Sequence, residues 1–121
     1  MSVSITGLRE LQERLRTVSP DVTSRRRAQE GQEIVGEAEA ISPRDTENFA
    51  DSWDFSAPRS SHTLQVTNDA RDPQGRPYAE FVHPKGKRKT TAETIREFSR
   101  ARAPQLAEDL AQLVSDHLNQ T

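Results

Sequence analysis

The stretch that decides the fold reads DVTSRRRAQEGQEIVGEAEAI and runs from Asp21 to Ile41. It contains no proline, although Pro20 comes directly before it and Ser42-Pro43 directly after it. Proline fits the first turn of a helix but disfavours helix in the residue before it. The apolar residues of this stretch share roughly one helical face: Val22, Ala28, Ile34, Val35, Ala38 and Ile41. The sequence therefore predicts one long helix with a weak apolar stripe.

Before this helix the pattern has a different period. Residues 2–6 alternate between hydroxyl side chains and β-branched apolar ones, which is typical of a short, half-buried strand. After Gly7, apolar residues return at spacings of three and four, at Leu8, Leu11, Leu15 and Val18. We expect a strand followed by a helix.

After the long helix the sequence predicts a hairpin. Asp45 or Thr46 can cap a short helix from Glu47 to about Ser52. Residues 52–57 and 62–67 then alternate, and the loop 58–61 joins them. The side chains expected to face inward are Trp53, Phe55, Ala57, Leu64 and Val66. Residues 68–77 hold two prolines, a glycine and four charged residues, so we expect an exposed loop that becomes ordered only on assembly.

The C-terminal part is helical by its spacing. A helix begins at Thr90 or Thr91, and Ala103-Pro104 either kinks it or starts a new one. The cleanest apolar stripe follows, at Leu106, Leu110, Leu113, Val114 and Leu118. The predicted fold class is α+β, with a small antiparallel sheet packed against the long helix and the C-terminal helices in a single domain, residues 1–121.

Composition narrows the function. The 121 residues are 31% hydrophobic and 5% aromatic, so the core is thin and neighbouring chains are expected to add stability. No apolar run approaches the roughly 20 residues of a membrane span. The chain has no cysteine, which excludes disulfides and thiol catalysis. The sequence pI of about 5.9 argues against a dedicated nucleic-acid binder.

No catalytic motif stands out. His62, His83 and His117 are scattered, and none has the spacing of a metal site. There is no phosphate-binding glycine loop and no nucleophile elbow. We therefore predict a protein that is not an enzyme, with no catalytic, cofactor-binding or metal-binding residues. A hydrolase using His83 is a weaker alternative.

The charges fall into two blocks that the net charge of −2 conceals. Residues 29–54 carry eight acidic residues and one basic residue, whereas residues 83–102 carry seven basic and two acidic ones. The blocks are either two solvated faces or complementary surfaces, which meet within one chain or between copies.

Two short basic segments leave further alternatives open. The first is Arg25-Arg26-Arg27, in which Arg26 and Arg27 lie at helical spacing from Glu30 and Glu33; the segment either pairs along the helix in this way or contacts nucleic acid. The loop Pro84–Lys89 is either solvated, or contacts DNA or a neighbouring subunit, through Lys85, Lys87, Arg88 and Lys89.

The order of short motifs resembles a family of small phage tail components, the head–tail joining proteins of long-tailed phages. The motifs are the opening Val3–Leu11, the helix end Ile41-Ser42-Pro43-Arg44-Asp45-Thr46, the segment Phe49–Trp53 and the segment Pro77–His83. The chain departs from the family pattern at Glu47, where glycine is usual, and at His83, where an acidic residue is common.

This resemblance implies a structural virion protein at the head–tail junction, a tail terminator or tail-completion subunit without catalytic residues. Its expected partners are further copies in a ring of six, the connector or stopper and tail-tube proteins, and packaged DNA held without sequence specificity, with no membrane. It would be assembled in the host cytoplasm. The candidates for the core or subunit seams are Asp45, Thr46, Trp53, Phe55, Tyr78, Phe81 and Val82. The alternative function is a small nucleic-acid-binding regulator that uses residues 25–27 and 85–89.

Overall fold

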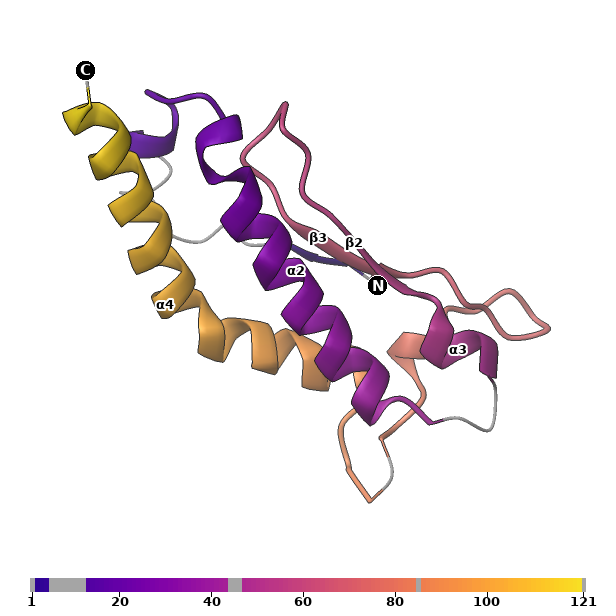
Figure 1. Cartoon of the computed structure of the whole chain (residues 1–121). Coiled ribbons are helices and arrows are strands. Elements are labelled where there is room, and N and C mark those ends of the chain that lie inside the picture. Colours follow the sequence, from indigo (N-terminus) through magenta and orange to yellow (C-terminus); the bar gives the residue numbers. More distant parts are fainter. Residues whose placement is uncertain (1, 5–12, 44–46, 85, 121) are drawn as a thin grey trace.

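The computed structural model describes residues 2–4, 13–43, 47–84 and 86–120, and it has the α+β class that the sequence predicts (Figure 1). Of the helix predicted from Leu8 to Val18, the structure describes residues 13–18; residues 13–15 are helical, whereas residues 16–18 form a turn, so the helix ends earlier than predicted. The labelled elements are β1 (Ser2–Ser4), α2 (Asp21–Ile41), α3 (Glu47–Asp51), β2 (Trp53–Ser56), β3 (Gln65–Asn68), the 3-10 helix η1 (Tyr78–Glu80) and α4 (Thr91–Asn119).

The three strands form one antiparallel sheet in the order β1-β3-β2. Phe55 lies opposite Val66 on the side of the helices, whereas Asp54 and Gln65 are exposed, as the alternation predicts. The second strand was predicted at 62–67, but β3 begins at Gln65. The residues before Gln65 are not part of the strand, and the carbonyl of Thr63 accepts a hydrogen bond from the Arg27 guanidinium instead.

The long helices lie on one side of the sheet. α2 packs on β2 and β3, while α4 lies beside α2 and contacts η1 and β1 (Figure 1). The main core includes Ile34, Phe49, Leu64, Val66 and Ile95, and a smaller cluster joins Leu15, Val18 and Val114. Leu15 and Val18 therefore face inward, as their spacing predicts.

α4 is one helix with a bend, which decides between the two alternatives for Ala103-Pro104. Thr90 caps its first turn by accepting the backbone N–H of Glu93 at 3.2 Å. Pro104 lies inside the helix and cannot donate to the carbonyl of Arg100. Figure 1 shows the change of direction near the middle of α4, which is the expected result of an interior proline.

Gly31 brings α2 close to the sheet. A Cβ atom at this position would lie 2.5 Å from Cδ2 of Phe55 and 3.0 Å from Cδ1 of Leu64. Both neighbours belong to the core or pack against it, so neither has free space to move. The absence of a side chain at Gly31 therefore sets the distance between α2 and the β2–β3 hairpin.

Replacing Gly31 by alanine should lower the free energy of unfolding by about 1–3 kcal/mol, because the added methyl overpacks the contact with Phe55. Gly36→Ala is the matched control, since a Cβ at Gly36 meets nothing within 4 Å. That variant should be more stable by about 0.5–1 kcal/mol, the usual gain of alanine over glycine within a helix. Urea unfolding of both variants measures the difference. Equal effects of the two substitutions would contradict the close contact.

Candidate functional site

The predicted site residues do not gather in one place. Asp45, Thr46 and Lys85 lie outside the described residues. The others divide between the core and one exposed end of the molecule.

An aromatic row connects these two regions. Phe49 lies between Trp53 and Tyr78 with ring centroids 6.0 Å from each, and Phe81 follows at 5.6 Å from Tyr78. Phe49 is fully buried, whereas Phe81 is 38% exposed. The sequence did not single out Phe49 as a core residue, because it belongs to a five-residue helix that is too short to show an apolar stripe. The row leads from the core to the surface.

Trp53 and Phe55 serve the core of the single chain. The indole Nε1 of Trp53 donates to Oγ of Ser42 at 2.7 Å, and that hydroxyl donates to the carbonyl of Ala38 at 2.6 Å. This chain of hydrogen bonds fixes the C-terminal end of α2. Phe55 is half-buried against Gly31.

Phe81 and its neighbours form the exposed end. The guanidinium of Arg76 lies over the Phe81 ring, 4.9 Å from its centroid, and Arg76 Nε donates to Asp72 Oδ2 at 2.7 Å. Burial acts to raise the pKa of Asp72, but hydrogen bonds from the Arg76 backbone and side chain and from the Gln74 N–H outweigh it. The pKa of Asp72 therefore lies below its usual value. These contacts hold the turn within the single chain, whereas we expected residues 68–77 to become ordered only on assembly.

The basic loop follows directly. Thr91 donates to the carbonyl of half-buried Val82 through its N–H at 2.7 Å and its hydroxyl at 2.8 Å, which closes the loop. Lys89 forms an ion pair with Glu97 of α4. Lys87 and Arg88 are exposed and make no ion pair with a described residue.

Part of the two charge blocks meets within the chain. Arg102 of α4 contacts Glu30 of α2 at 2.7 Å and also pairs with Glu33. Arg26 contacts Glu30 at 3.1 Å and Asp109 at 3.0 Å. Hydrogen bonds from Gln105 and Arg26 hold the pKa of Asp109 below its usual value. This network fastens α4 to α2, and Glu30 within it is only 1% exposed.

Other acidic residues of the block stay uncompensated. The carboxylates of Glu39, Asp51 and Asp54 make no ion pair with a described residue. Glu39 is half-buried on α2, and Asp51 and Asp54 are exposed at the end of α3 and on β2. We call these three residues the acidic margin.

Arg27 corrects one prediction. It is 2% exposed and pairs with no carboxylate of the described residues, although helical pairing with acidic residues was expected. Its guanidinium donates to the carbonyls of Thr63 at 2.6 Å, Pro20 at 2.9 Å and Pro58 at 3.0 Å, and to Oγ1 of Thr23 at 3.1 Å. Burial lowers its pKa. Arg27 therefore clamps the hairpin loop to the start of α2.

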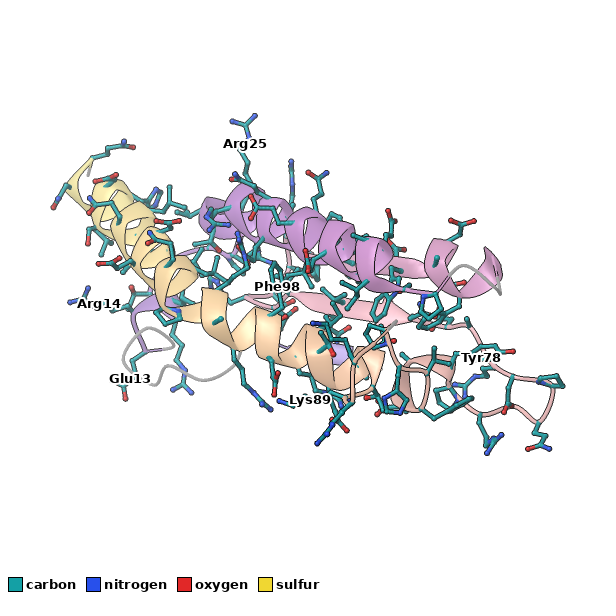
Figure 2. All side chains as sticks on the ribbon, turned by 90° about the horizontal axis from the view of Figure 1, so that it is seen from below. Glu13, Arg14, Arg25, Tyr78, Lys89 and Phe98 are labelled. Atoms are coloured by element: carbon teal, nitrogen blue, oxygen red, sulfur yellow. The ribbon has the colours of Figure 1, made fainter. Side chains whose placement is uncertain are left out.

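The basic segment 25–27 is thus not one surface. Arg26 is held by Glu30 and Asp109, and Arg27 is buried. Arg25 alone is exposed and points away from α2 (Figure 2).

Arg27→Met should lower the free energy of unfolding by about 3 kcal/mol, since it leaves several buried acceptors without a donor. Arg27→Lys should recover only part of this loss, because an ammonium group cannot reach acceptors arranged for a planar fork. Arg25→Met is the control and should change stability by no more than about 0.5 kcal/mol. Chemical denaturation tests the series. Similar losses for Arg25→Met and Arg27→Met would refute the clamp.

The histidines remain separate. His62 Nε2 lies 3.1 Å from the carbonyl of Val18, and His83 and His117 are exposed on other elements. Within the described residues, no three His, Cys, Asp or Glu side chains are grouped so that they could hold a metal ion. No helix in the described part of the chain is long and apolar enough to cross a membrane.

Comparison with known proteins finds no matching family model, no matching curated protein and no matching solved structure.

Proposed function

We propose that the protein is a structural subunit of a phage head–tail junction, a tail terminator or tail-completion protein that forms a ring around the DNA channel. Its place is then the virion, and its partners are further copies, the adjoining connector or stopper and tail-tube proteins, and passing DNA. The order of motifs from Val3 to His83 and the thin core support this proposal.

The observation that carries the proposal is the charge left over after intrachain pairing. Arg102 forms ion pairs with both Glu30 and Glu33 within the chain. The acidic margin and the pair Lys87 and Arg88 form no ion pair with any residue that the structure describes, and they lie in different parts of the chain. Two complementary surfaces on one subunit are what a head-to-tail contact between copies requires.

The geometry gives less support to a nucleic-acid-binding regulator. Of residues 25–27 only Arg25 is exposed, and Lys89 is paired with Glu97. The exposed cations Arg25, Lys87 and Arg88 therefore do not form one continuous basic patch. Arg25 projects from α2 near its start (Figure 2), whereas the other two lie in the loop before α4.

The purified protein should form a closed ring of six copies, alone or on a tail tube. Native mass spectrometry gives the copy number, and electron microscopy gives the shape. A two-fold dimer, an open filament, or a monomer that no tail protein converts into a ring would contradict the proposal.

DNA binding by the monomer should be weak and only moderately dependent on salt. About three contacts from Lys85, Lys87 and Arg88 give a slope of log K against log salt concentration no steeper than about −3. Fluorescence anisotropy with a labelled duplex, at salt concentrations from about 50 to 200 mM, measures this slope. Micromolar or tighter binding with a steeper slope would favour the regulator instead.

A further inference from the structure

Phe81 has the properties of an anchor for another protein. Among the described residues, Phe81 and Leu118 are the large hydrophobic side chains exposed to solvent, by 38% and 49%. A single exposed apolar side chain is ordinary on a protein surface. Phe81 differs from Leu118 because it ends the aromatic row that begins in the core.

The ring of Phe81 is held before any partner arrives. Tyr78 contacts it at 5.6 Å between centroids, and the guanidinium of Arg76 lies 4.9 Å from its centroid. Asp72 fixes Arg76 in turn, through the Nε contact at 2.7 Å and a bond from the Arg76 N–H at 2.8 Å. An anchor that is already ordered loses little conformational entropy when a partner covers it.

Three further cations lie in the loops before and after η1, the element directly before Phe81. Arg71, Lys87 and Arg88 come from the two loops that flank η1, and all three are exposed without an ion pair to a described residue. We call Phe81, Arg76, Arg71, Lys87 and Arg88 the Phe81 end. A surface of this kind fits a partner that places carboxylates around a site for an aromatic ring.

The acidic margin of the same protein offers those carboxylates. Val35 and Glu39 follow Gly31 at spacings of four, which places Glu39 on the flank of α2 that faces β2. Asp51 ends α3 and Asp54 lies in β2, and both elements contact α2. Asp54 is exposed on the face of the sheet opposite to Phe55, so Glu39 and Asp51 are the margin residues on the side of the helices. η1 contacts α4, and its Tyr78 also contacts Phe49 of α3 at 6.0 Å between ring centroids.

We propose that the Phe81 end of one chain docks on the acidic margin of a second copy, with Lys87 and Arg88 opposite Glu39 and Asp51. This assignment rests on the proposed ring-forming function and names the contact that builds the ring. Because the two surfaces differ, each copy keeps one free surface for the next, and the contact builds a ring if its rotation closes, as the proposed function requires.

Single-cysteine variants test the contact, because the chain has no cysteine of its own. His83→Cys places a thiol beside Phe81, and Asp51→Cys places one in the acidic margin. Mixed under mild oxidation, the two variants should form the 83–51 disulfide at least about tenfold faster than either forms a homodimer. Arg25→Cys mixed with Asp51→Cys is the control and should give no such excess.

A second substitution tests the anchor. Phe81→Ser on the His83→Cys chain should weaken the contact about 30-fold, as expected for a central aromatic anchor, and should suppress the 83–51 disulfide accordingly. Leu118→Ser on the same chain is the matched control and should leave cross-linking unchanged. Thermal melting confirms that both variants are folded.

The outcomes separate this contact from the proposed function. Selective 83–51 cross-links with open polymers instead of rings would uphold the contact and refute the ring. Rings that form without selective 83–51 cross-links would refute the contact but not the proposed ring. The same holds for rings in which Phe81→Ser leaves the cross-linking rate unchanged. Monomers without selective cross-links would refute both.

Discussion

The burial of Arg27 is the constraint on which the arrangement of this small protein depends. The core-facing positions of α2 include Thr23, Arg27, Glu30 and Gly31 beside only a few apolar residues. A helix with such a face cannot be held by apolar area alone. Its position is set instead by hydrogen bonds with defined directions, because a buried cation is tolerated only where donors and acceptors match. Arg27 fixes α2 to the hairpin loop, and Glu30 fixes it to α4.

The sequence predicted the elements better than the contacts. The bounds of α2 match because prolines mark both of its ends, and the start of α4 matches because Thr90 caps it. The site was predicted only in part, because the spacing of apolar residues and the composition assign every charged residue to the solvent-exposed surface. The inward direction of Arg27 depends on carbonyls more than 30 residues away, and no local pattern encodes them. Nor could spacing show that Trp53 is buried while Phe81 is exposed, since both lie in apolar segments.

The two charge blocks have two separate roles. Where α2 and α4 run side by side, opposite charges neutralise one another and stabilise the fold, with Phe98 between the helices (Figure 2). Within the described part of the chain, Arg71, Lys87 and Arg88 of the Phe81 end and the carboxylates of the acidic margin form no ion pair. A chain with few apolar residues thus uses charge for both folding and association, which suits a subunit whose stability is completed by its neighbours.

The contact between Gly31 and Phe55 also limits how this sequence can change over time. The side chains at positions 31 and 55 occupy the same space between α2 and β2. A larger residue at position 31 therefore requires a smaller one at position 55. In descendants of this protein, alanine or serine at position 31 should accompany a residue smaller than phenylalanine at position 55. Positions 31 and 55 should therefore vary together, although they lie in different elements and far apart along the chain.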